Sequence, residues 1–204
     1  MPSRNTARHD VADSYYHVYA RGANKAPIFI SSEDKFYFLY LFSRYLSKNQ
    51  AISKTGTVYP HYRQKIELLT YCLMDNHFHL LIYQNERGML SMFMKSLMTS
   101  YTAYFNQKYR RTGSLFESRF KASLITGDAY FVHVSRYIHL NPRSWKHFPY
   151  SSIKYFRNAT EPEWLQTSRV LGQFTGRDEY LTFVSDYEDS KQMLDSIKRE
   201  LANL

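Results

Sequence analysis

The fold is decided by residues 65–84, KIELLTYCLMDNHFHLLIYQ. Two runs of apolar, aromatic and β-branched side chains, 65–74 and 77–84, flank the dipeptide Asp75-Asn76, which is a turn signal. The pattern predicts two adjacent antiparallel strands that are joined by a tight turn. We therefore expect a sheet that is built around this hairpin.

The segments on either side of the hairpin alternate between strand and helix patterns. The expected elements are a strand at 15–20, a helix from Ser31 or Ser32 to about Ser47, a helix at about 89–107, a strand within 115–125 and a helix from Asp128 to about Leu140. Pro142 stops the last helix, because the residue before a proline is pushed out of the α region. This order predicts an α+β fold, in which a central antiparallel sheet carries helices mainly on one face.

The charge of the chain is unevenly distributed. The 27 basic and 18 acidic residues give a formal charge of +9. Residues 95–146 hold nine bases and two acids, or +7, whereas the chain from Arg157 onward holds six bases and nine acids, or −3. A basic surface of this size favours a polyanion such as nucleic acid, which we expect along the middle of the chain.

Aromatic residues make up 17% of the chain, and 19 of them are tyrosines. Unstacked bases pack well on such rings, so the composition fits single-stranded nucleic acid, although core packing is the alternative for each ring. Cys72 is the single cysteine, which excludes an internal disulfide. Since no apolar stretch is long enough to span a bilayer, we expect a soluble, cytoplasmic protein without a membrane partner.

Two motifs carry candidate chemistry. His77-Phe78-His79 lies on the second hairpin strand, where positions i and i+2 share a face, so both imidazoles can reach one metal ion while Phe78 points into the core. Tyr137 and Asn141 are four residues apart on a helix and project together. A chance triplet is the alternative for the histidines. A buried tyrosine and a helix-capping asparagine are the alternative for the second motif.

Taken in order, the motifs resemble those of a known family. They are YHVYARG (16–22), LMDNHFHLLI (73–82), GSLFESRFKASLI (113–125), RYIHLNP (136–142) and the pair Ser151-Ser152. The set resembles the HUH endonuclease superfamily, within it the single-tyrosine transposases, and most closely the REP-associated tyrosine transposases. The resemblance covers residues 14–156 and implies a ferredoxin-like fold.

The resemblance also implies an activity. Tyr137 would attack a DNA phosphodiester and become joined to the 5′ phosphate, leaving a 3′ hydroxyl. His77 and His79 would hold a divalent cation, Mg²⁺ or Mn²⁺, with Asn141 as the third ligand. Many relatives have a glutamine at that place, so Asn141 has a shorter reach. The implied partner is single-stranded DNA with a hairpin, and the implied state is a monomer or homodimer.

Four basic residues are candidate DNA contacts: Arg21, Arg119, Lys121 and Arg143. Arg119 and Lys121 are expected to alternate on a strand and share a face, where they would suit phosphates. A solvated surface is the alternative. His17 and His139 are interpreted as structural.

We expect a flexible basic arm at 1–13, a catalytic domain at 14–149 and an accessory C-terminal segment at 150–204. Two other functions stay open at this point. One is a non-catalytic module that binds single-stranded nucleic acid, and the other is a metal-dependent hydrolase of small phosphoesters that uses the histidine pair alone.

Overall fold

The computed structural model describes residues 10–157 and 160–186 of the 204-residue chain. Most of the predicted basic arm, residues 1–9, and the end of the predicted accessory segment, residues 187–204, lie outside the described residues.

Four antiparallel strands form one sheet in the order β2-β3-β1-β4. They are β1 (Ser14–Arg21), β2 (Ile66–Met74), β3 (His77–Gln84) and β4 (Lys121–Ile125). In chain order a helix follows β1 and another follows β3, which is the ferredoxin-like arrangement. The predicted α+β fold is therefore confirmed.

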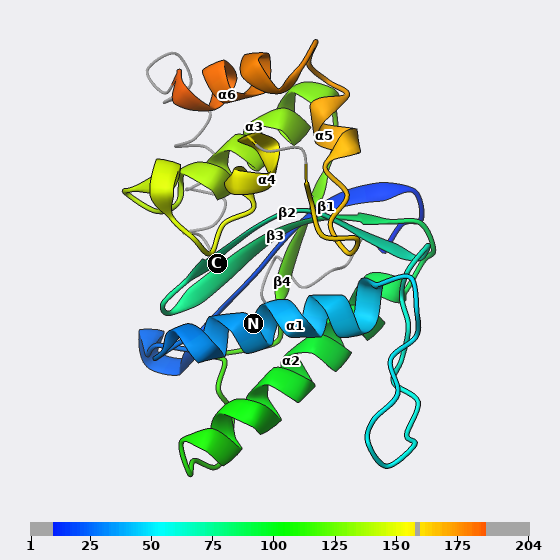
Figure 1. Cartoon of the computed structure of the whole chain (residues 1–204), viewed down its shortest axis with the longest axis vertical. Helices are drawn as coiled ribbons and strands as arrows, with labels where there is room; N and C mark the ends of the chain where they lie inside the picture. The colour runs from blue at the N-terminus through cyan, green and yellow to red at the C-terminus, as the bar shows by residue number, and fades with distance from the viewer. Residues whose placement is uncertain (1–9, 158–159, 187–204) are drawn as a thin grey trace.

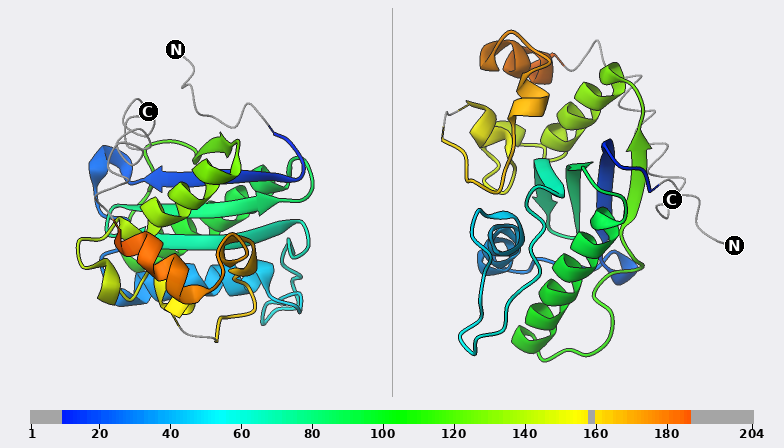
Figure 2. Two further views of the ribbon diagram at one scale, coloured as in Figure 1. Left: turned by 90° about the horizontal axis from the view of Figure 1, so that it is seen from above. Right: turned by 90° about the vertical axis from the view of Figure 1, so that its right-hand side faces the viewer.

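Helices α1 (Ser32–Leu46) and α2 (Met89–Lys108) cover one face of the sheet (Figures 1 and 2). The Asp34 carboxylate accepts hydrogen bonds from the backbone N–H groups of Ile30 and Ser31, at 2.8 and 2.9 Å. This capping arrangement fixes the start of α1 where the sequence predicts it.

The β2–β3 hairpin is also confirmed, because Met74 pairs with His77 across the turn. Phe78 points to the face that α1 covers and is fully buried there, with its ring centroid 5.0 Å from that of Phe38. The alternation of a strand then sends the two histidines on either side of Phe78 to the opposite face.

That opposite face carries a second layer of helices. They are α3 (Asp128–Leu140), α4 (Ile153–Arg157), α5 (Ser168–Leu171) and α6 (Arg177–Ser185), with the 3-10 turn η2 (Trp145–His147) between α3 and α4. A further 3-10 turn, η1 (Ala23–Lys25), follows β1 and does not belong to this layer. Figure 2 shows the sheet edge-on between the two layers. None of the helices in the described ranges has the length and apolar composition that a membrane span requires.

The two longest helices, α1 and α2, lie on one face, as expected. The shorter helices α3 to α6 cover the other face as well. Leu69, Cys72 and Leu81 are buried on the second face, where they pack with Val134 and Ile138 of α3. A sheet that is apolar on both sides must bury both, which explains why segments after residue 150 pack against α3 and β2.

The expected strand placement of Arg119 is wrong. Phe116 pairs with Gly22, and β4 resumes only at Lys121, which pairs with Tyr19. Residues 117–119 form a bend between these two paired parts, so Arg119 is exposed on the bend and does not share a strand face with Lys121.

Candidate active site

The two histidines of the HxH motif meet Tyr137 between the sheet and α3. The ring centroids of His77 and His79 are 5.0 Å apart, and the Tyr137 ring centroid lies 5.4 Å from that of His79. The Tyr137 ring is also 5.8 Å from the ring of His17 on β1. Three imidazoles and one phenol therefore form a single cluster on the second face of the sheet.

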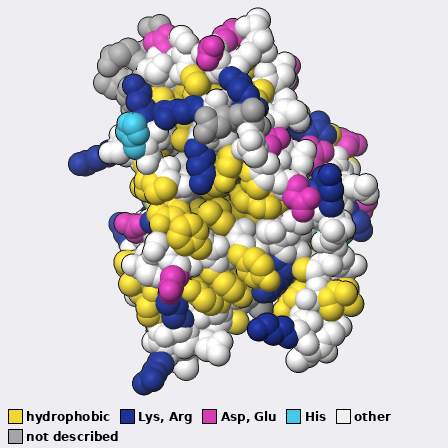
Figure 3. Space-filling view, in the orientation of Figure 1, with side chains coloured by type: hydrophobic (Ala, Val, Ile, Leu, Met, Phe, Trp, Pro, Cys, Tyr) yellow, Lys and Arg dark blue, Asp and Glu magenta, His cyan; other side chains and the backbone are white. Residues whose placement is uncertain are grey.

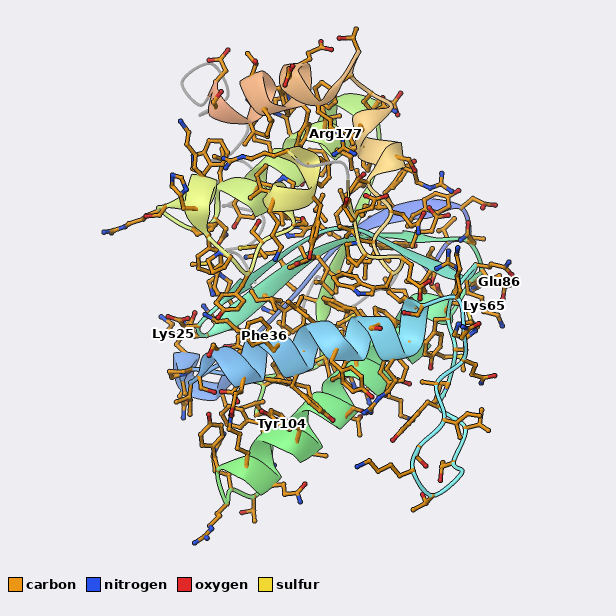
Figure 4. All side chains as sticks on the ribbon, viewed as in Figure 1. Lys25, Phe36, Lys65, Glu86, Tyr104 and Arg177 are labelled. Carbon is orange, nitrogen blue, oxygen red and sulfur yellow. The ribbon has the colours of Figure 1, made fainter. Side chains whose placement is uncertain are left out.

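The protonation pattern of His77 follows from its neighbour Asn76. The Asn76 amide nitrogen donates to the Lys25 carbonyl at 3.1 Å, which turns the amide oxygen toward His77 Nδ1 at 2.7 Å. That oxygen accepts only, so His77 carries its proton on Nδ1 and keeps a lone pair on Nε2. Figure 4 labels Lys25 at this end of the sheet, whereas the Lys65–Glu86 pair marks the other end.

Asn141 joins the histidine to the tyrosine. Its side-chain oxygen lies 3.2 Å from His77 Nε2, and its side chain forms a hydrogen bond with Tyr137 that lowers the tyrosine pKa. An N–H donated to the phenol oxygen explains that direction, and it leaves the amide oxygen facing the His77 lone pair. Two acceptors that face each other at this distance repel unless they share a positive charge.

His79 is held by a histidine from the neighbouring strand. His79 Nδ1 and His17 Nε2 are 3.0 Å apart, and both side chains are buried. Burial lowers the pKa of His17 to about 3, and burial together with the nearby His17 and His77 lowers the pKa of His79 well below its usual value. Both rings are neutral, so one of these two nitrogens carries a hydrogen and donates it to the other. When His79 donates it, His79 Nε2 keeps a lone pair.

Burial raises the pKa of Tyr137 to about 12, although the hydrogen bond from Asn141 acts in the opposite direction. The Tyr137 side chain is nearly buried, with 9% of its surface exposed. In the protein alone the phenol is therefore protonated at neutral pH and needs local support to act as a nucleophile.

The four predicted basic residues lie at different depths around this cluster. Arg21 pairs with His77 in the β1–β3 register and forms a bidentate ion pair with Glu117, at 3.0 and 3.2 Å. Lys121 is nearly buried, with Nζ 5.9 Å from the Tyr19 ring centroid. Arg119 and Arg143 are exposed on loops.

His17, Asn76 and Tyr19 also lie in the cluster, although the sequence motifs predict only a structural role for His17 and no site role for Asn76 or Tyr19. His17 and Tyr19 alternate along β1, and that pattern predicts a shared face. Their proximity to the HxH pair depends on β1 lying beside β3, which one sequence does not reveal. Asn76 was interpreted only as a turn residue.

The donor atoms of the cluster fit a cation. In the described ranges, no group of three or more His, Cys, Asp or Glu side chains is arranged to hold a metal. The candidate set is instead two imidazoles and one amide, and the lone pairs of His77 Nε2 and Asn141 Oδ1 already face each other. Imidazole and amide ligands of this kind suit a divalent metal such as Mn²⁺.

Comparison with known proteins identifies a matching family and similar solved structures. The profile of a family described as "Transposase IS200 like" matches residues 10–141. A solved structure of a REP-associated tyrosine transposase bound to a REP hairpin aligns with a TM-score of 0.54 at 12% identity, over 78% of this chain and 89% of that one. At this identity the likeness is one of fold. No curated protein sequence is significantly similar to the chain.

Proposed function

Because this chain belongs to the family of IS200-like transposases, we propose that it cleaves and rejoins single-stranded DNA with Tyr137 as the nucleophile. The proposed substrate carries a hairpin, as the DNA in the similar solved structure does. His77, His79 and Asn141 are the proposed ligands of a divalent cation, Mg²⁺ or Mn²⁺, at the cleavage site. A monomer or a homodimer is compatible with this proposal.

The observation that carries the proposal is the position of the Asn141 side chain between His77 Nε2 and the Tyr137 phenol. Tyr137 and Asn141 are one helical turn apart, so α3 presents the phenol and the amide together. A nucleophile and a set of ligand atoms thus lie in one cluster, which is the juxtaposition that metal-assisted phosphoryl transfer requires.

In the proposed reaction the Tyr137 oxygen attacks phosphorus as the bond from phosphorus to the 3′ oxygen breaks. The phenol loses its proton and the departing 3′ oxygen gains one, so the products are a 5′-phosphotyrosine and a 3′ hydroxyl. The hydrogen bond from Asn141 supports the negative charge on the attacking oxygen. The reverse attack by a 3′ hydroxyl restores the DNA strand, because the phosphotyrosine bond conserves the energy of the phosphodiester.

A divalent cation, when bound, polarises the scissile phosphate and stabilises the charge of the transition state. The three proposed ligands are neutral in the folded protein, since burial lowers the pKa of both His77 and His79. Because they are neutral, they would leave the positive charge of a bound cation available to the negatively charged phosphate. Nitrogen ligands favour Mn²⁺ over Mg²⁺, which prefers oxygen.

The test uses the full chain, Mn²⁺ and a pool of single-stranded oligonucleotides that carry hairpins. We expect a protein–DNA complex that survives denaturation with the wild-type chain, and none with Tyr137→Phe. The variant should still bind the pool, because only the hydroxyl group is removed. His77→Ala should reduce both the adduct and its dependence on Mn²⁺.

The same experiment separates the alternatives. DNA binding by the wild-type chain without any adduct would indicate a non-catalytic binding module. A normal adduct yield from Tyr137→Phe would reject the assignment of the nucleophile. Hydrolysis of small phosphoesters that does not depend on Tyr137 would indicate a hydrolase that uses the histidine pair alone.

A further inference from the structure

A second phenol lies in the cluster and has no role in the proposed reaction. Tyr19 is 9% exposed, and its hydroxyl is buried without a hydrogen-bond partner among the described residues. A buried hydroxyl that lacks a partner costs free energy, of the order of 1–3 kcal/mol, unless something else supplies one. Such a group in a folded protein requires an explanation, and one explanation is that a bound ligand supplies the missing hydrogen-bond partner.

The strand register places this hydroxyl beside the cleavage site. Tyr19 pairs with His79 of β3 on one side and with Lys121 of β4 on the other. Its ring centroid is 5.8 Å from that of His79 and 5.9 Å from Lys121 Nζ. A row across the sheet therefore runs from the candidate cation ligand to a phenol and then to an ammonium group.

Tyr19 and the proposed nucleophile, Tyr137, pack against the same two imidazoles. The Tyr19 phenol is an O–H donor, and its ring centroid lies 5.7 Å from that of His17 and 5.8 Å from that of His79. The Tyr137 ring centroid lies 5.8 Å from that of His17 and 5.4 Å from that of His79. A phosphodiester that bound beside Tyr137 would therefore have an O–H donor from β1 and a cation from β4 near it.

We propose that Tyr19 and Lys121 form a binding site for the non-bridging oxygens of the scissile phosphodiester. The Tyr19 hydroxyl donates a hydrogen bond to one oxygen, and the Lys121 ammonium offsets the negative charge that builds up during attack. Neither residue transfers a proton. Their effect is largest in the transition state, where the phosphoryl oxygens carry the most charge. This inference rests on the proposed function.

The discriminating variant is Tyr19→Phe, assayed in the full chain with the oligonucleotide that the wild-type chain captures. We expect the single-turnover rate of adduct formation to fall about 100-fold, as on loss of one donor to a developing oxyanion. The DNA concentration for half-maximal rate should change little. Because no described residue bonds to the hydroxyl, the Tm of the variant should stay equal or rise.

Tyr62→Phe is the matched control. Tyr62 is 4% exposed, and its hydroxyl bonds to the Met92 carbonyl and the Ser96 hydroxyl on the face that α2 covers. We expect this variant to lose stability and to keep the wild-type rate. Lys121→Gln should slow adduct formation, and Lys121→Arg should restore part of the rate because it restores the charge.

The outcomes separate this inference from the proposed function. A wild-type rate in Tyr19→Phe, in a chain that forms the adduct, overturns the inference alone. A fall in rate that is accompanied by a fall in Tm in Tyr19→Phe also overturns it, since that pattern indicates a structural tyrosine. A wild-type chain that forms no adduct overturns both. An adduct that persists in Tyr137→Phe and disappears in Tyr19→Phe would make Tyr19 the nucleophile and would also overturn both.

Discussion

The chemistry of single residues in this site depends on which nitrogen of each imidazole is already engaged. Asn76 occupies His77 Nδ1, and His17 occupies His79 Nδ1. Both HxH histidines thus have Nδ1 engaged, which leaves Nε2 of each as the nitrogen that could bind a cation. Partners of this kind orient a metal-binding imidazole and raise its affinity for the ion, typically 10- to 100-fold.

We therefore expect His17→Leu to weaken cation binding without removing a ligand. The Mn²⁺ concentration for half-maximal adduct yield should rise about 10- to 100-fold, whereas the yield at saturating Mn²⁺ should recover. His17→Gln keeps an acceptor for the His79 N–H and should lie between Leu and wild type. The same half-maximal concentration in all three proteins, measured by Mn²⁺ titration of adduct yield, would contradict this role.

At the scale of elements, α3 is held by α6 at the two residues that flank Tyr137. Arg136 donates to the Phe183 and Asp186 carbonyls at 2.7 and 2.9 Å, and its guanidinium lies 3.8 Å from the Phe183 ring centroid. His139 Nδ1 is 2.7 Å from the Tyr180 hydroxyl. The described part of the segment after residue 150 therefore braces α3, the helix that carries Tyr137.

This brace predicts that Tyr180→Phe destabilises the protein. The change leaves the buried His139 without its partner on α6, which should lower the free energy of unfolding by about 1–3 kcal/mol. Urea denaturation measures the loss. Thr182→Ala, on the exposed side of the same helix, is the control and should have little effect. Equal stability of the two variants would show that α6 docks without this contact.

His139 also predicts how stability depends on pH. Burial lowers its pKa from 6.5 to about 3, so between these two pH values His139 is protonated in the unfolded chain and neutral in the folded chain. The contribution of neutral His139 to the free energy of unfolding is complete above about pH 6.5. It is lost as the pH falls toward 3, at about 1.4 kcal/mol per pH unit. His139→Gln should flatten the profile of unfolding free energy between pH 6 and 4 by that slope. An unchanged slope would mean that His139 is protonated in the fold.

The bounds of the helices and strands differ in how well one sequence predicts them. The bounds of α3 are correct because local signals, Asp128 and Pro142, set them. The strand expected within 115–125 is present, but the placement of Arg119 on it is wrong, because the bend at residues 117–119 follows Phe116 pairing with Gly22, a contact between distant segments. Tyr19 is missed for a similar reason, since its neighbours come from two other strands.

At the scale of the whole molecule, positive charge collects close to the site. Beyond Asn141 the chain carries Arg143, Lys146 and, after a short turn, Arg157, whose guanidinium donates to the Lys146 carbonyl at 2.6 Å. The Trp145 ring centroid lies 5.6 Å from both the Lys146 and Arg157 charges. Figure 3 shows Lys and Arg side chains gathered with a His over η2 and α4. A phosphate backbone and an unstacked base both suit such a surface.

The triple variant R143Q/K146Q/R157Q tests whether DNA crosses this surface. Each phosphate contact on a single strand contributes about −0.7 to the slope of log affinity against log salt, so the slope should become shallower by about 2. Fluorescence anisotropy with a labelled single strand, in the Tyr137→Phe background, gives the slope without cleavage. The control K54Q/K95Q/R110Q removes the same charge from exposed positions away from α3. If long-range charge alone governs binding, the two triple variants will weaken it equally. A path over η2 and α4 requires the first to lose more, because only contacted phosphates release their counterions.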